Sequence, residues 1–300
     1  ELNLQRSFTT NKNGEIDESI KFKNIDLWSP DNPKLYNVTV KIEGDEIVDQ
    51  IGFREIKTKG KQIFLNGSPI KFKGISMHAE PIGEKGVAFS KAHFDSLVAT
   101  SKELNINFIR AAHYPYTRHM AKVCDELGIM LWEEIPVYWN INWTNKQTKE
   151  DALNMLSNLV TRDWNRASVV VWSLGNETPF SKDRMTFMND LKDRLGELDV
   201  SRLTSAAILS GDAKTFAKLI NIIAKAGLET KDLTAKERHI FEEIVKNVPI
   251  PFEKLLPFEI NINDPLANEL DLIAYNEYFG WYYTSFFSAQ IGIRESLLRE

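Results

Sequence analysis

The sequence predicts an α/β protein with an incomplete (β/α)₈ TIM barrel, of which about six strands are present, preceded by part of a β-sandwich. Residues 1–58 alternate apolar and polar side chains with the two-residue period of half-buried strands. Beyond them, apolar strand-like segments alternate with helical ones, which is typical of a parallel sheet covered by helices. We therefore expect residues 1–58 to be the C-terminal part of the sandwich domain and residues 59–300 the N-terminal part of the barrel.

The composition limits the classes of function. With 43% apolar residues in 300, the chain can build a sizeable core, and its 37 basic and 42 acidic residues offer no positive surface for nucleic acid or membrane lipid. The single cysteine, Cys124, excludes an internal disulfide or a zinc site made of cysteines. No signal peptide or membrane span is visible, and the pattern leaves cytoplasm, periplasm and secretion open.

Strand patterns in the first part are clearest in YNVTVKIEG (36–44) and in residues 46–58. They are followed by two apolar runs that flank Asn66-Gly67. This dipeptide readily adopts the positive φ angles of a two-residue turn, so we expect a tight β-hairpin there.

The barrel elements follow in regular order. Strands are expected at 72–78, 107–113, 129–136, 169–177, 202–208 and 270–278, and helices at about 90–104, 117–127, 148–166 and 181–197. Ser90 can cap the first of these helices, and Gly128 stands just after the second, where a C-terminal glycine belongs. Because six strands cannot close a barrel of eight, we expect the chain to be a piece of a longer protein.

A helical insertion at about 210–264 interrupts this order. Within it, Thr234 and Glu237 have the spacing of a capping box, and Pro249 closes the helix that they open. The insertion is expected on the side of the barrel where the strands end. It either decorates the surface, shapes the pocket or makes an oligomer contact.

Polar residues stand at the C-terminal ends of successive predicted strands. They are His78, Arg110 with His113, Glu133 with Glu134, Asn176 with Glu177, and Asn276 to Tyr278. In a (β/α)₈ barrel these ends form one rim, which is the face that carries the chemistry. No glycine-rich phosphate loop accompanies them.

Glu177 ends the apolar run of VVVWSLGNETP (169–179). If Trp172, Tyr278 and Trp281 line a pocket around it, partial desolvation favours its protonated form, which a general acid needs. The amide of Asn176 could then donate to a substrate hydroxyl, as in glycosidic bond cleavage by paired carboxyl groups. Alternatively, Glu177 merely caps the helix that follows.

Six ordered motifs resemble glycoside hydrolase family 2, the family of β-galactosidases, β-glucuronidases and β-mannosidases. They are LWSPDNPKLY (27–36), FLNGSPIKFKGISMHAE (64–80), NFIRAAHYPY (107–116), DELGIMLWEEIP (125–136), WSLGNETP (172–179) and NEYFGWY (276–282). The first resembles the family's immunoglobulin-like domain and the others its catalytic barrel.

The resemblance implies a retaining exo-β-glycosidase with Glu177 as the general acid/base. It also implies that Asn176 holds the 2-hydroxyl of the sugar, that Tyr278 lies against the nucleophile and that Trp281 forms an apolar wall. Glu134 would hold Arg110 or a hydroxyl in place. The implied substrate-binding residues are His78, Arg110, His113, Glu134, Asn176, Tyr278 and Trp281.

The resemblance places the nucleophile, a glutamate, on the seventh strand of the barrel, beyond Glu300. Since the two carboxyl groups of a retaining enzyme stand roughly 5–5.5 Å apart, one without the other cannot complete a double displacement. We therefore expect this chain alone to be inactive and poorly folded.

The sequence leaves the substrate and the class of function open to other interpretations. Residues 78–80 read HAE where many members have HED, and Glu277 stands where well-known β-glucuronidases have arginine, so both departures leave the identity of the sugar open. We place β-galactosidase first and β-glucuronidase a close second. A non-catalytic carbohydrate-binding protein on a degenerate barrel is another. A metal hydrolase is disfavoured, because the first barrel strand carries the lone His78. We expect a β-linked oligosaccharide or glycoside as partner and neither cofactor nor metal, and homo-oligomerisation of the full-length protein stays open.

Overall fold

The structure is a computed structural model that describes residues 4–208, 233–247 and 264–276, together with residues 221, 224, 225 and 227–229. Its contacts divide the chain into two compact units. The first comprises Glu1–Ile135, Met155–Trp172 and Leu195–Leu203, and the second comprises Pro136–Asn154, Ser173–Arg194 and Thr204–Glu300. Across the described segments, no helix is both long and apolar enough to cross a membrane.

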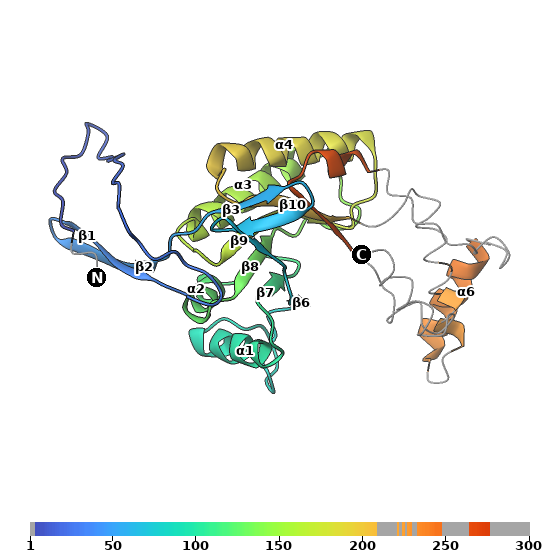
Figure 1. Cartoon of the computed structure of the whole chain (residues 1–300). Coiled ribbons are helices and arrows are strands. Elements are labelled where there is room, and N and C mark those ends of the chain that lie inside the picture. Colours follow the sequence, from blue (N-terminus) through green and yellow to red (C-terminus); the bar gives the residue numbers. More distant parts are fainter. Residues whose placement is uncertain are drawn as a thin grey trace. The chain divides into compact units, whose positions relative to one another are not determined.

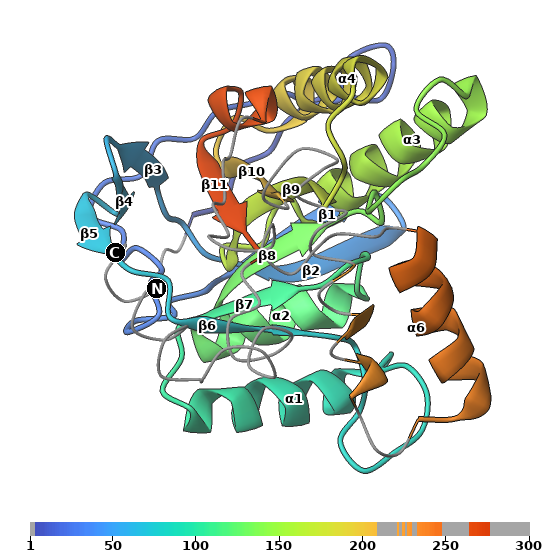
Figure 2. The same ribbon diagram turned by 90° about the vertical axis from the view of Figure 1, so that its right-hand side faces the viewer.

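Six strands form a sheet in which neighbours in the sequence are neighbours in space, as in an open half of a barrel (Figures 1 and 2). Its strands β6 and β7, β7 and β8, and β10 and β11 pair in parallel; β6 and β7, for example, are aligned from Gly74 opposite Phe108 to Met77 opposite Ala111. The strands are β6 (Gly74–Met77), β7 (Phe108–Ala111), β8 (Met130–Glu134), β9 (Val169–Asn176), β10 (Leu203–Ile208) and β11 (Leu272–Tyr275). The expectation of an incomplete TIM barrel is thereby confirmed.

The central strands β8 and β9 are buried in the sheet. All residues of β8 and β9 are buried, and each strand begins with an apolar run, Met130–Trp132 or Val169–Trp172, as is typical of parallel strands covered on both faces. Helices separate the strands along the chain as expected: α1 (Lys91–Glu103), α2 (Arg118–Leu127), α3 (Lys146–Asp163) and α4 (Lys182–Leu198).

The predicted helix ends are also confirmed. The Ser90 hydroxyl accepts a hydrogen bond from the His93 backbone N–H at 3.2 Å, which caps α1. Gly128 ends α2 in the left-handed conformation with φ 72°. A Cβ at this position would stand 2.5 Å from the Pro30 carbonyl oxygen, so both the backbone angle and the packing require glycine.

The N-terminal part is antiparallel. Strands β1 (Tyr36–Ile42) and β2 (Asp45–Ile51) pair from Tyr36 opposite Ile51 to Ile42 opposite Asp45, and β3 (Ile56–Lys59), β4 (Gln62–Leu65) and β5 (Ser68–Ile70) form a second sheet. The turn between β4 and β5 is Asn66-Gly67 with φ 52° and 81°, which confirms the predicted tight hairpin. These sheets are consistent with part of a sandwich domain.

Trp28 ties the N-terminal segment to the helices and strands of the same unit. Its ring is fully buried, and its indole N–H donates to the Asp125 carbonyl oxygen at 2.9 Å. The Asn66 amide donates in turn to the Trp28 carbonyl oxygen at 2.9 Å. The motif that contains Trp28 is therefore a packing element of the first unit.

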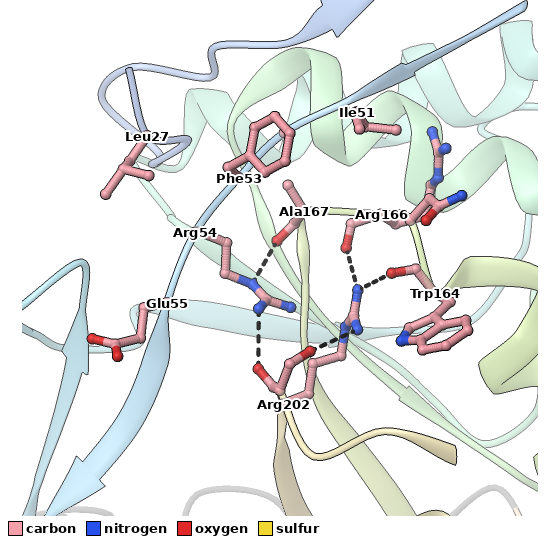
Figure 3. A pocket seen from close by; sticks show the side chains of 12 residues that line it. Leu27, Ile51, Phe53, Arg54, Glu55, Trp164, Arg166, Ala167 and Arg202 are labelled. Carbon is pink, nitrogen blue, oxygen red and sulfur yellow. Dashed lines mark hydrogen bonds between the residues drawn. The ribbon is translucent and has the colours of Figure 1, made fainter. Parts of the chain in front are cut away.

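A pocket of the first unit lies where β9 and β10 begin (Figure 3). Arg54 donates to the carbonyl oxygens of Ala167, Ser201 and Val169, and Arg202 donates to those of Trp164, Arg166 and Val169. The guanidinium groups thus satisfy backbone oxygens of the segments that precede the two strands. At this end of the strands, such a network supports stability, since barrel enzymes place chemistry at the opposite end.

Only part of the predicted insertion lies within the described residues. Helix α6 (Ala235–Asn247) has the expected capping box: the Thr234 N–H donates to the Glu237 carboxylate at 2.9 Å, and the Glu237 N–H donates to the Thr234 hydroxyl at 3.3 Å. No residue of α6 is buried. The short helix η2 (Pro265–Asn268) then precedes β11.

Candidate active site

Glu177 follows the last residue of β9 in a left-handed conformation, with φ 52° and 7% of its surface exposed. Its backbone N–H donates to the Ala207 carbonyl oxygen on β10 at 2.7 Å. A non-glycine residue in this conformation costs about 1 kcal/mol, so the strand ends have to hold it there. The result is a buried carboxyl group at the C-terminal end of β9.

Among the described residues, two uncharged donors contact the Glu177 carboxylate. The Trp139 indole N–H donates to its Oε2 at 2.9 Å, and the Asn276 amide donates to its Oε1 at 2.7 Å. Trp139 follows β8 and Asn276 follows β11, so donors from two different strand ends hold the carboxyl group that follows β9. Because each carboxyl oxygen accepts one of these hydrogen bonds, the donors fix the direction in which the carboxyl group points.

Asn176 belongs to the same cluster. It is 4% exposed, and its Oδ1 accepts a second hydrogen bond from the Asn276 amide at 2.9 Å. With Oδ1 turned toward Asn276, the Nδ2 donor group lies on the other side of the amide carbon. The structure thus places Asn176, Glu177 and Asn276 together in the second unit.

Trp139 is a site residue that the sequence did not indicate. Its backbone N–H donates to the Asn176 carbonyl oxygen at 3.0 Å, and Tyr138 forms an isolated parallel bridge with Asn176. Trp139 itself is left-handed with φ 56°, an unusual conformation for so large a side chain. The sequence does show an aromatic residue shortly after a barrel strand, which could have marked Trp139 as a candidate. Nothing in the sequence predicts its left-handed turn.

A second polar cluster lies in the first unit, at the ends of β7 and β8. Arg110 donates to both oxygens of Glu134, from Nε to Oε2 at 3.1 Å and from Nη2 to Oε1 at 3.2 Å. His113 Nδ1 lies 2.6 Å from Glu134 Oε1, and the Trp132 indole N–H donates to Glu134 Oε2 at 2.8 Å. Glu134 is therefore held by a guanidinium group, an imidazole and an indole.

His78 joins this cluster through its ring. The ring centre lies 5.7 Å from that of His113 and 6.1 Å from that of Tyr114. The structure thus brings His78, Arg110, His113 and Glu134 together. The other two expected site residues, Tyr278 and Trp281, lie outside the described residues.

The expectation that Trp172 lines a pocket around Glu177 is wrong. Its ring is fully buried in the first unit, where the indole N–H donates to Asp199 at 2.8 Å and the Arg202 guanidinium lies 5.5 Å from the ring centre. Trp172 is a core residue because its indole finds both a buried acceptor and a packing partner there.

Glu133 does not share the surroundings of Glu134. Successive residues of a strand point to opposite faces, and Glu133 is buried with its Oε1 3.5 Å from Arg162 Nη2 on α3. The pKa of Glu133 is raised well above its usual range, mainly by burial and secondly by the negative charge of the neighbouring Asp163. The prediction that Glu133 contributes to the rim is therefore wrong, because its carboxyl group faces α3.

Metal ligands do not gather at either cluster. Within the segments that the structure describes, no group of three or more histidine, cysteine, aspartate and glutamate side chains could hold a metal ion. The chemistry that these clusters offer is that of carboxyl, amide, imidazole and guanidinium groups.

Family models decide the relationship of the chain to known proteins. The model of the glycosyl hydrolases family 2 TIM barrel domain matches residues 56–252, and a second model of glycosyl hydrolases family 2 matches residues 3–54. The chain belongs to glycosyl hydrolases family 2. Glu177 and Glu134 accordingly stand at strand ends of a family 2 barrel.

Proteins named as glycosidases have similar sequences over part of this chain. A beta-galactosidase of Thermoanaerobacterium thermosulfurigenes is 34% identical over 188 residues, which are 61% of this chain and 25% of that protein. A beta-glucuronidase of Paenibacillus borealis is 31% identical over 205 residues, 61% of this chain and 34% of that protein. The chain thus spans about a quarter to a third of the length of these two relatives.

Solved family 2 structures have the same fold. A beta-galacturonidase from Eisenbergiella tayi bound to galacturonate matches with a TM-score of 0.58 and 30% identity, over 61% of this chain and 34% of that one. An FMN-binding beta-glucuronidase from Facaelibacterium prausnitzii matches 86% of this chain and 34% of that one with a TM-score of 0.62 and 25% identity.

Proposed function

We propose that the protein containing this chain hydrolyses terminal β-glycosidic bonds as a retaining exo-β-glycosidase with Glu177 as its general acid/base. The observation that carries the proposal is the buried Glu177 carboxyl group at the end of β9, oriented by Trp139 and Asn276. Membership of glycosyl hydrolases family 2 supports the reaction class.

In this proposal Glu177 acts twice. It first protonates the glycosidic oxygen while a second carboxylate attacks the anomeric carbon, and it then deprotonates the water that releases the sugar. Both steps require that the carboxyl group keeps one direction while its charge changes. The indole and amide donors, which stay neutral throughout, meet this requirement.

The second carboxylate is not assigned within the described residues. We propose that the nucleophile is a glutamate supplied by a part of the protein outside this chain. It follows that the chain alone does not complete the reaction, because a double displacement needs both carboxyl groups at roughly 5–5.5 Å.

Substrate contacts are proposed from both clusters. Asn176 would donate to the 2-hydroxyl of the sugar, while Glu134 holds Arg110 and His113 so that they contact the glycone together with His78. Tyr278 beside the nucleophile and Trp281 against the sugar ring complete the proposed set.

The proposed substrate is a β-galactoside, with a β-glucuronide as the alternative. Relatives named beta-galactosidase and beta-glucuronidase match over the same share of this chain, 61%. This supports a β-glycoside as substrate and favours neither a β-galactoside nor a β-glucuronide. A panel of nitrophenyl β-galactoside and β-glucuronide, assayed with the full-length protein, separates them by the ratio of kcat/KM. Turnover of neither substrate, nor of other β-glycosides, would overturn the proposed activity.

The role of Glu177 is tested by Glu177→Ala in the full-length protein. We expect turnover of phenyl glycosides, which need protonation of the leaving oxygen, to fall about 10²- to 10⁴-fold. Turnover of dinitrophenyl glycosides, whose leaving group departs unprotonated, should fall far less in the first chemical step. Glu150→Gln, at an exposed position, is the control, and its turnover of both substrates should equal that of the unsubstituted protein. Equal losses on both substrates would show that Glu177 is not the proton donor.

A further inference from the structure

We propose that Trp139 positions the Glu177 carboxyl group with its indole N–H and, with its exposed ring, forms a subsite for an aromatic leaving group. The inference rests on the proposed function and adds to it the residue that recognises the aglycone. It is carried by the indole contact to Glu177, by the exposure of the ring and by the fixed backbone around it.

The backbone holds the indole in one place. Tyr138 bridges to Asn176, the Trp139 N–H donates to the Asn176 carbonyl oxygen at 3.0 Å, and the Asn176 N–H donates to Val137 at 2.9 Å. The chain then turns through the left-handed conformation at Trp139. A strained residue that its neighbours hold so firmly is typical of a functional position.

The indole combines a bound edge with a large exposed surface. Its Nε1 lies 2.9 Å from Glu177 Oε2, yet 57% of the residue surface is exposed. The Trp139 ring also contacts that of Tyr138, with the ring centres 6.1 Å apart. A largely exposed tryptophan whose N–H is satisfied is suited to stack on a planar or apolar group. Glu177, in contrast, is 7% exposed, so a molecule that approaches its carboxyl group meets the indole as well.

The direction of the indole indicates which part of the substrate it meets. Glu177 Oε1 is bound by Asn276, which also binds Asn176, the residue that we assign to the glycone hydroxyl. Trp139 binds the other oxygen, Oε2. A proton donor lies about 2.6–3.2 Å from the oxygen that it protonates, so the leaving group begins beside the carboxyl group that the indole contacts. We therefore assign the indole to the leaving-group side.

Two substitutions separate the two roles. Trp139→Phe removes the N–H and keeps an aromatic ring, whereas Trp139→Gln keeps an N–H donor and removes the ring. Trp164→Phe is the matched control, because Trp164 has 56% of its surface exposed and its described contacts lie at the start of β9 and β10. All are made in the full-length protein and compared at equal fractions folded, by circular dichroism.

Leaving-group acidity tests the positioning role. For Trp139→Phe, we expect kcat/KM to fall about 10- to 100-fold on phenyl glycosides, since one hydrogen bond to the negative charge that develops on Glu177 during proton transfer is lost. On dinitrophenyl glycosides we expect a loss below about 3-fold, because proton donation matters little there. Trp139→Gln and Trp164→Phe should keep the leaving-group dependence of the unsubstituted protein. An unchanged dependence in Trp139→Phe would overturn this role.

Leaving-group shape tests the subsite. An aryl and an alkyl glycoside with leaving groups of equal acidity should differ in kcat/KM, and Trp139→Gln should lower the aryl-to-alkyl ratio by about 3- to 10-fold, the size of one aromatic contact. Trp139→Phe should keep most of the ratio. A ratio that Trp139→Gln leaves unchanged would overturn the subsite.

A measurement on the unsubstituted protein covers the case in which a variant does not fold. Phenyl 1-thio-β-glycosides should inhibit about 3- to 10-fold more tightly than methyl 1-thio-β-glycosides of the same sugar. Equal inhibition would overturn the aromatic subsite. Inactivity of the unsubstituted protein on every β-glycoside would instead refute the proposed function, so the two failures are distinct.

Discussion

Glu134 and Glu177 are both buried carboxyl groups at strand ends, but their donors differ in charge. Glu134 accepts from the Arg110 guanidinium and contacts His113, whereas Glu177 accepts from the indole of Trp139 and the amide of Asn276. A hydrogen bond to a charged donor is shorter and stronger than one to a neutral donor. In the proposed function, Glu134 orients a charged cluster and Glu177 moves a proton, so the two carboxyl groups should respond differently to substitution.

The sharpest way to break this comparison is to neutralise each carboxyl group in turn. Glu177→Gln should lower kcat/KM on phenyl glycosides about 10²- to 10⁴-fold, because an amide cannot transfer a proton to the leaving oxygen. Its free energy of unfolding should change by about 1 kcal/mol, the value of one neutral hydrogen bond. Steady-state kinetics and urea unfolding of the full-length protein measure both quantities. A destabilisation of several kcal/mol would assign Glu177 a structural role.

Glu134→Gln should show the opposite balance between stability and chemistry. The Arg110 side chain is 14% exposed and that of Glu134 is 1% exposed, so the substitution leaves a largely buried cation without its anion. We expect the free energy of unfolding to fall by about 3 kcal/mol. Urea unfolding beside the exposed control Glu150→Gln measures the loss. If Glu134→Gln unfolds at the same urea concentration as Glu177→Gln, the distinction between the two sites fails.

Asp125 is a further buried carboxyl group, for which the effect of burial on the pKa outweighs that of its hydrogen-bond donors. Desolvation raises the pKa of Asp125 to about 6, although the Ser168 N–H and Arg166 act in the opposite direction. The unfolded chain loses this proton near pH 3.8 and the folded chain near pH 6, so the contribution of Asp125 to stability decreases as pH rises between these values. The decrease should reach about 3 kcal/mol.

Comparison with Asp125→Asn isolates this contribution. The variant cannot titrate at this position, so the difference in unfolding free energy between it and the unsubstituted protein should change across the window from pH 4 to pH 6. A difference that stays constant with pH would show that Asp125 titrates alike in both states.

The smallest expected effect concerns a neutral donor. Asn276→Ala removes one of the two described hydrogen bonds to Glu177 and should lower kcat/KM on phenyl glycosides about 10-fold. The exposed Asn13→Ala serves as the control and should leave kinetics unchanged. Loss of stability with unchanged kinetics would show that Asn276 supports the fold alone.

The parts of the structure that were predictable from sequence depend on local chemistry. Ser90, Gly128, the Asn66-Gly67 turn and the Thr234 capping box are each fixed by a few neighbouring residues, and the structure confirms all four. The order of strands followed from alternating apolar and helical segments. The position of Glu177 followed from a buried run that ends in polar residues.

The parts that were not predictable depend on side-chain direction. Trp172 packs on Asp199, and Trp139 reaches Glu177 through a left-handed turn that no pattern of residues indicates. The direction of Glu133 could have been found, because two adjacent strand residues cannot face the same side of a sheet. A sequence pattern can therefore place a residue at the end of a strand, but it does not show which groups the side chain contacts.

The central claim is that Glu177 supplies and removes the proton at the leaving-group side. Azide rescue of Glu177→Ala in the full-length protein tests it most directly, with a dinitrophenyl β-glycoside as substrate. Azide needs no general base, so we expect turnover to rise with azide concentration and the product to be a β-glycosyl azide, identified by nuclear magnetic resonance. Unchanged turnover, or an azide product of α configuration, would contradict the assignment of Glu177 as the acid/base of a retaining enzyme.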